Sequence, residues 1–214
     1  MKRLPKHIGI IPDGNRRWAE ERGLSREEGY RAGLAPGLSL FKLCKKERIN
    51  ELTFYGFTQD NTKRPKEQTL AFQKACIEAV KIISNEDAAL LIVGNSESPM
   101  FPEELLPYTR RTIFGSGAVK INFLVNYGWQ WDLGRAMIEG GKQERFVEKI
   151  HSSDVSRVDL IIRWGGRRRL SGFLPVQSVY SDFYVVDSYW PDFKPEHFYK
   201  ALDWYKQQDI TLGG

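Results

Sequence analysis

Short apolar runs alternate with helical patterns along most of this chain. Apolar runs of strand length occupy residues 8–11, 52–57, 88–93, 120–127, 157–163 and 183–186. Helical patterns lie at residues 18–47 (with breaks near 23–25 and 36), 68–83, 103–114, 131–139, 143–150, 174–182 and 195–208. Apolar strands that alternate with helices indicate a parallel sheet covered on both faces. The sequence therefore predicts an α/β fold with a central, mainly parallel six-stranded sheet flanked by helices.

Length and charge narrow the class of protein. A chain of 214 residues suits one domain, over residues 1–214, and its net charge of +5 points to anionic partners. Nucleic acid is a poor fit, because the arginines cluster at glycine-containing turns and no nucleic-acid-binding motif is present. Cys44 and Cys76 are too few for a disulfide framework. With no signal peptide and no long apolar run, we expect a soluble, cytoplasmic protein.

The first apolar run ends in a segment suited to phosphate. A turn at residues 12–15 contains Asp13, and Arg16 and Arg17 open the helical pattern that follows. The free N–H groups at the start of a helix attract anions, and arginine forks bind phosphate. A carboxylate beside them suits Mg²⁺. The segment predicts a metal–diphosphate site, with an ordinary capped turn as the alternative.

Two further polar segments follow predicted strands. Residues 58–65 form a polar loop that either closes over a substrate or is a solvated connection. Residues 163–171 combine two glycines with four arginines, and this arrangement favours an anion site over a solvated turn. Ligands of parallel α/β folds bind beyond the carboxyl ends of the strands, so we expect these segments to meet there.

Five segments, in order, resemble signatures of the cis-prenyltransferase family of the undecaprenyl diphosphate synthase type. They read HIGIIPDGNRRWA at 7–19, FTQDNTKRP at 57–65, NYG followed by WD at 126–132, RWGGRRRLSGF at 163–173, and YSDFY followed by WPDF at 180–193. The likeness extends over nearly the whole chain. Because the five motifs keep the family's order, they are far more specific together than any one alone.

The resemblance implies a Mg²⁺-dependent enzyme that condenses an allylic isoprenyl diphosphate with a C5 isoprenoid diphosphate. It implies catalytic roles for Asp13, Asn15 and Asn61, and metal binding by Asp13 and Asp182. The residues that match the allylic diphosphate site are Gly14, Asn15, Arg16, Arg17, Arg26, Thr58 and Arg64. The residues assigned to the acceptor diphosphate are Arg163, Arg167, Arg169 and Ser171. A homodimer, peripheral membrane association and an apolar tunnel near helices 29–47 and 68–83 are also implied.

Departures from the family pattern leave the acceptor open. Tyr30 stands where the family usually has His, Arg16 replaces a Gly, Thr62 replaces a Trp, and Arg167 replaces a Glu. The tail at 211–213 lacks the family's arginine, so we expect Arg167 to bind the acceptor diphosphate in its place. The alternatives are non-head-to-tail condensation of the lavandulyl type, a non-catalytic subunit of a two-protein prenyltransferase, and a protein that binds RNA or an anionic membrane.

Overall fold

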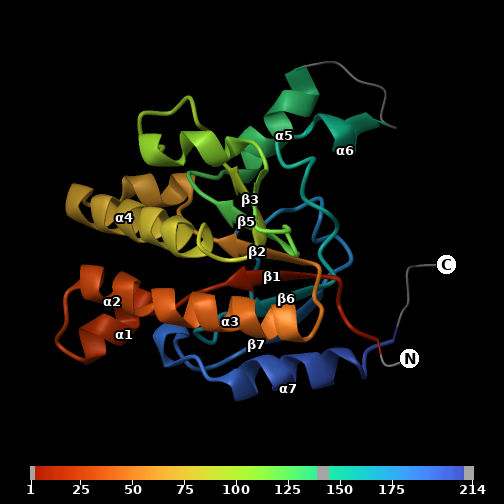
Figure 1. The fold of residues 1–214 in the computed structure, drawn as a ribbon. Helices are drawn as coiled ribbons and strands as arrows, with labels where there is room; N and C mark the ends of the chain where they lie inside the picture. Colours follow the sequence, from red (N-terminus) through yellow and green to blue (C-terminus); the bar gives the residue numbers. More distant parts are fainter. Residues whose placement is uncertain (1–2, 139–144, 210–214) are drawn as a thin grey trace.

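One seven-stranded sheet organises the chain (Figure 1). The computed structural model describes residues 3–138 and 145–209. The strands are β1 His7–Ile11, β2 Glu51–Tyr55, β3 Ala88–Val93, β4 Thr112–Phe114, β5 Val119–Leu124, β6 Leu160–Arg163 and β7 Asp182–Val185. Their order is β4-β3-β5-β2-β1-β6-β7, and every neighbouring pair is parallel except β3 and β4. The predicted α/β class is confirmed.

Helices and short 3₁₀ segments connect the strands. They are α1 Asn15–Glu21, α2 Arg26–Ala32, α3 Leu34–Lys46, η1 Gln59–Lys63, α4 Lys66–Ile83, η2 Glu103–Thr109, α5 Trp129–Ile138, α6 Phe146–Lys149, η4 Trp190–Asp192 and α7 Pro195–Tyr205. Ser25 caps α2 through the backbone N–H of Glu28, which accounts for the predicted break at 23–25. The predicted break near Pro36 falls at Gly33, between α2 and α3, and Pro36 itself lies in the first turn of α3, where no N–H partner is lost. No described helix is both long and apolar enough to span a bilayer.

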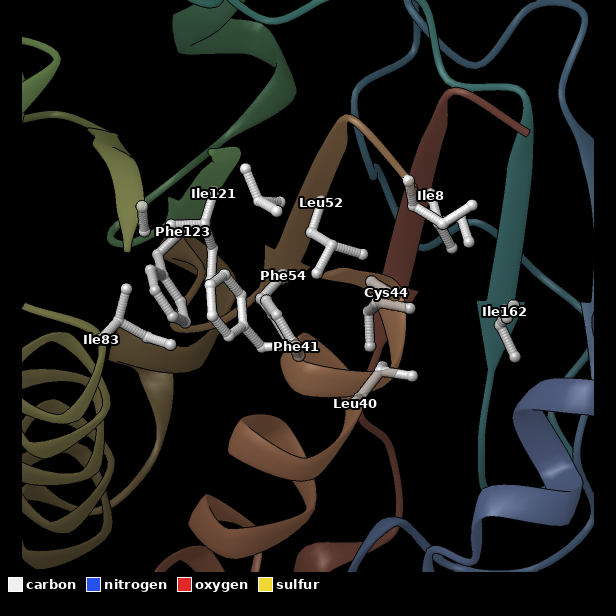
Figure 2. Packing of buried hydrophobic residues seen from close by; sticks show 14 of the residues in the cluster. Ile8, Leu40, Phe41, Cys44, Leu52, Phe54, Ile83, Ile121, Phe123 and Ile162 are labelled. Atoms are coloured by element: carbon white, nitrogen blue, oxygen red, sulfur yellow. The ribbon is translucent and has the colours of Figure 1, made fainter. Parts of the chain in front are cut away.

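The two faces of the sheet bury separate apolar clusters. On one face, strand residues such as Ile8, Leu52 and Phe123 meet Phe41 of α3 and Ile83 of α4 (Figure 2). Helix α7 adds its own buried side chains to this cluster. The opposite face is covered largely by the segments at 150–158 and 173–178. Burial on both faces explains why apolar residues predominate in the strands.

Four elements differ from the sequence-based prediction. The sheet has a seventh strand, because residues 112–114 form the short antiparallel edge strand β4 beside β3. The helix predicted over 103–114 therefore stops at Thr109. In the predicted helix over 174–182, residues 175–180 form turns and Asp182 starts β7, since Leu174 has φ 33° and precedes a proline, which disfavours helical backbone. In the predicted helix at 143–150, only Phe146–Lys149 is helical, and residues 143–144 lie outside the described ranges.

Candidate active site

A cleft of about 500 Å³ opens at the carboxyl ends of β1, β2 and β6. These strands are neighbours in the middle of the sheet, so the segments that follow them converge. The predicted residues that line the cleft are Asp13, Gly14, Asn15, Arg16, Arg17, Thr58, Asn61, Arg64, Arg163, Arg167, Arg169 and Ser171. The structure thus brings most of the candidate residues to one place.

Asp13 joins the segments that follow β1 and β6. Its Oδ2 accepts a hydrogen bond from Arg163 Nη2 at 2.8 Å, and its Oδ1 lies 3.4 Å from Arg17 Nη2. Arg17 Nη2 also donates to the Gly165 carbonyl at 3.0 Å. Gly165 has φ 81°, and a Cβ there would lie 2.6 Å from Arg17 Nη2. A glycine at this turn therefore lets the two segments approach each other.

Arg163 fixes the shape of the arginine-rich turn. Its side chain is 5% exposed, and its Nη1 donates to Ser171 Oγ at 2.9 Å and to the Arg169 carbonyl. From β2, Tyr55 Oη donates to the Ser171 carbonyl at 2.6 Å. Burial raises the pKa of Tyr55, which keeps its hydroxyl protonated as this donor. Side chains of two strands therefore position the turn at 163–171.

The loop after β2 places a second group of polar side chains across the cleft. Asn61 Oδ1 accepts from the Thr58 N–H at 3.3 Å, at the start of η1. Arg64 Nη1 lies 3.5 Å from Tyr30 Oη. Burial lowers the pKa of Arg64, and the positive charge of Arg16 lowers it further. An anion bound between these two guanidiniums would relieve their repulsion.

The cleft carries an excess of positive charge. Among the described residues, six arginines line it and three carboxylates, those of Asp13, Glu20 and Asp60. Two buried polar atoms, Arg163 Nε and Asn15 Oδ1, have no hydrogen-bond partner in the described parts of the chain. Buried polar groups are normally paired, so these atoms indicate a ligand with both acceptor and donor or metal character.

Two predicted site residues lie elsewhere. Arg26 forms an ion pair with Glu20 at 3.0 Å and is absent from the residues that line the cleft. Asp182 starts β7, beside Leu160 at the amino end of β6, so it lies at the sheet edge opposite Asp13. Its carboxylate is 3.4 Å from Arg3 Nη2. This chain therefore does not bring the two predicted metal ligands together, and its described residues hold no group of three metal-binding side chains.

The sequence-based prediction missed three aromatic residues at the site. Tyr30, Tyr55 and Phe72 line the cleft and also an adjoining apolar cavity of about 90 Å³. The cavity lies between α3, α4 and the sheet, where the tunnel was expected. Two of these residues could have been predicted from the sequence. Tyr55 lies at the end of a predicted strand, and Tyr30 stands where the family usually has His. Nothing separated Phe72 from the other apolar residues of its helix.

The fold and the paired cleft and cavity define a class of enzyme that handles anionic substrates with apolar tails. The family model of undecaprenyl diphosphate synthase matches residues 11–213. An isoprenyl transferase of Clostridium tetani is 33% identical, over all of this chain and 91% of its own length. A farnesyl-diphosphate-specific ditrans,polycis-undecaprenyl-diphosphate synthase of Buchnera aphidicola is 32% identical, over 98% of this chain and 91% of its own.

A solved structure shares the fold. The lavandulyl diphosphate synthase of Lavandula x intermedia, in complex with dimethylallyl diphosphate, superposes with a TM-score of 0.85 at 22% identity and covers 99% of both chains. The chain belongs to the cis-prenyltransferase family, and it is a prenyltransferase.

Proposed function

We propose that the protein transfers the prenyl group of an allylic isoprenoid diphosphate to a C5 isoprenoid diphosphate and releases diphosphate. The observation that carries this proposal is the continuity of the cationic cleft with the apolar cavity. Six residues line both: Pro12, Asn15, Tyr30, Tyr55, Gly56 and Phe72. A prenyl diphosphate has the same two halves, since its head pairs with guanidinium groups and its tail gains by leaving water.

We assign the allylic diphosphate to the segment after β1 and the loop that faces it. Gly14, Asn15, Arg16 and Arg17 lie on the first, and Thr58 and Arg64 on the second. Breaking the allylic C–O bond places negative charge on the departing diphosphate. Hydrogen-bond donors that are already fixed where this charge develops lower the activation barrier. Asn61 acts by holding the backbone of Thr58 in place.

We assign the acceptor diphosphate to Arg163, Arg167, Arg169 and Ser171. Binding there holds the acceptor's double bond beside the allylic carbon, and this fixed proximity speeds carbon–carbon bond formation. The new carbon–carbon bond forms as the allylic C–O bond breaks, and the proton that the acceptor loses as its new double bond forms passes to the released diphosphate. Arg163 is already oriented for this role by Asp13 and by the turn itself.

The residues present fit Mg²⁺ at Asp13. Magnesium usually binds through one or two carboxylates, substrate phosphates and waters, so a single carboxylate in a diphosphate cleft suffices. The Asp13 side chain is 31% exposed and lines the cleft, so the ion can reach its carboxylate. When bound, Mg²⁺ supplies positive charge to the phosphoryl oxygens of the leaving group. Asp182 would need a different arrangement to take part.

Surface side chains and net charge bear on how the protein assembles and where it works. Exposed apolar side chains on α5 and α6, which include Met137 at 76% and Ile138 at 87%, support a homodimer. Sedimentation at micromolar concentration should show a two-fold dimer, and a monomer would contradict it. We propose a cytoplasmic location, and the net charge of +5 together with an apolar product supports peripheral contact with an anionic membrane. Flotation with anionic and neutral vesicles tests that contact.

The experiment is incubation with Mg²⁺, labelled isopentenyl diphosphate and one allylic diphosphate of five, ten, fifteen or twenty carbons. Organic-extractable label is the expected product, and its absence with all four donors would refute the proposal. Arg167 in the acceptor half of the cleft favours a second candidate, the lavandulyl-type joining of two allylic units. Incubation with dimethylallyl diphosphate alone distinguishes the two, since only the second reaction then gives a ten-carbon product.

A further inference from the structure

A pair of stacked rings stands where the cleft passes into the apolar cavity. Tyr30 of α2 and Phe72 of α4 stack with their ring centroids 4.7 Å apart and their planes 4° apart. Phe57 meets the edge of Phe72 at 5.7 Å, and Arg64 lies beside the Tyr30 hydroxyl. Tyr30 is 5% exposed, and both stacked residues line the cleft as well as the cavity. Any tail that runs from the arginines into the cavity passes this pair.

The residues that line the cavity beyond the pair extend along much of α4, but the open volume between them is small. One stripe of α4 lines it, at residues 72, 75, 76, 79, 82 and 83, which extends along roughly 16 Å of helix at 1.5 Å per residue. The open volume is nevertheless only about 90 Å³. A cavity of about 150 Å³ is known to hold one benzene ring. The open space is smaller than a benzene-sized cavity, so it leaves room for no more than about one five-carbon unit.

Aromatic side chains fill the rest of the channel. Phe54 and Phe123, from neighbouring strands, stack at 5.4 Å, and Phe54 meets the edge of Trp190 at 6.4 Å. All three line the cavity and are at most 7% exposed. They belong to the main apolar core, so a longer tail could enter only by displacing packed rings. Packed rings therefore resist entry of a longer tail far more than the walls of an open tunnel would.

We propose that the Tyr30–Phe72 pair and the packed rings of Phe54, Phe123 and Trp190 behind it restrict this enzyme to an allylic substrate with a five-carbon tail. The product is then released at ten carbons. This inference rests on the proposed prenyl transfer, of which it names the substrate. The occupant of the cavity is a branched five-carbon hydrocarbon tail, with its diphosphate in the arginine-lined cleft. The tails of geranyl and farnesyl diphosphate exceed the space.

The test is a tail-length series with the wild-type protein. Dimethylallyl, geranyl and farnesyl diphosphate are each offered with Mg²⁺ and labelled isopentenyl diphosphate. We expect kcat/KM to favour the five-carbon donor over the fifteen-carbon donor by about tenfold or more, since even one excess methylene in a filled pocket costs about this much. Products should stop at ten carbons. Efficient use of the farnesyl donor, or products longer than ten carbons, would overturn the inference.

Variants of the ring pair locate the restriction. Phe72→Ala should shift the donor preference toward the longer tails by about tenfold. Tyr30→Phe keeps the ring and removes only the hydroxyl beside Arg64, so it should keep the wild-type preference. Leu70→Ala is the matched control, because Leu70 lies on the same helix, is 47% exposed and does not line the cavity. If Phe72→Ala does not fold, the wild-type series decides alone.

A binding measurement separates failure of this inference from failure of the proposed reaction. Unreactive thiolodiphosphate analogues with five-, ten- and fifteen-carbon tails are titrated calorimetrically. Preference for the five-carbon analogue without any turnover would refute the proposed reaction and support the tail restriction. Turnover with tighter binding of the fifteen-carbon analogue would support the reaction and refute the restriction.

Discussion

Replacement of Asp13 by asparagine should change diphosphate binding in opposite directions with and without magnesium. The substitution keeps the size of the side chain and one oxygen but removes its negative charge. Asp13 lies 2.8 Å from Arg163 Nη2 and 3.4 Å from Arg17 Nη2. In the metal-free protein, the carboxylate therefore pairs with two guanidinium groups that a diphosphate would otherwise bind. Its negative charge also repels the diphosphate.

The size of the effect follows from this geometry. Two unit charges about 5 Å apart interact by about 3 kcal/mol at an effective dielectric constant of about 20. The Asp13 side chain is 31% exposed, so solvent screens part of this energy, and we take about 1.4 kcal/mol. Metal-free diphosphate should then bind about tenfold more tightly to Asp13→Asn. With Mg²⁺, turnover should fall by several orders of magnitude, since a lost metal contact costs about 4 kcal/mol of transition-state stabilisation.

The assay is calorimetric titration with inorganic diphosphate, in EDTA and in Mg²⁺, beside steady-state kinetics. Asp60→Asn is the control, because this carboxylate also lines the cleft but is 82% exposed and pairs with Lys63. It should leave both titrations nearly unchanged. Weaker binding by Asp13→Asn in both conditions would mean that Asp13 serves only to position Arg163. Full wild-type turnover in excess EDTA would also refute the metal assignment.

Three further predictions follow from the same geometry. Arg169→Ala should weaken the acceptor about tenfold and leave the allylic donor nearly unchanged, with the exposed Arg168→Ala as control in separate titrations. Arg167→Glu should abolish measurable acceptor binding, whereas deletion of residues 211–214, outside the described ranges, should do little; the acceptor KM of both variants tests this. Burial lowers the pKa of His7 below 6.5, so the unfolded state takes up a proton at a higher pH than the folded state does. The free energy of unfolding should therefore fall as the pH drops below 6.5, by up to about 1.4 kcal/mol per pH unit. Thermal melts between pH 7 and 5.5 should show a smaller fall for His7→Gln.

The local pattern of the sequence was enough to predict the sheet and the convergence of its polar segments. Apolar runs marked six strands because both faces of the sheet are buried, and parallel strands bring their carboxyl ends to one edge. The strand at Thr112–Phe114 was not predicted, because three residues are too few to show the alternation of apolar and polar side chains that marks a strand. The turns after Leu174 escaped because apolar residues at helical spacing also pack when the backbone is irregular.

The site could be predicted only where the sequence shows which end of a strand a residue occupies. Asp13 and Arg163 follow or end their strands, and they meet in the cleft. Asp182 begins its strand, so the parallel sheet carries it to the opposite edge, although its motif suggested a metal ligand. The Tyr30–Phe72 stack joins two helices far apart in sequence, and no local pattern encodes that contact.

A crystal structure with Mg²⁺ and dimethylallyl thiolodiphosphate, an unreactive allylic analogue, tests the central claim most directly. We expect the diphosphate within hydrogen-bond distance of Arg16 and Arg17, the metal on Asp13, and the five-carbon tail beyond Phe72 in the apolar cavity. A diphosphate bound outside the cleft, or a tail that points into solvent while the cavity stays closed, would contradict the account.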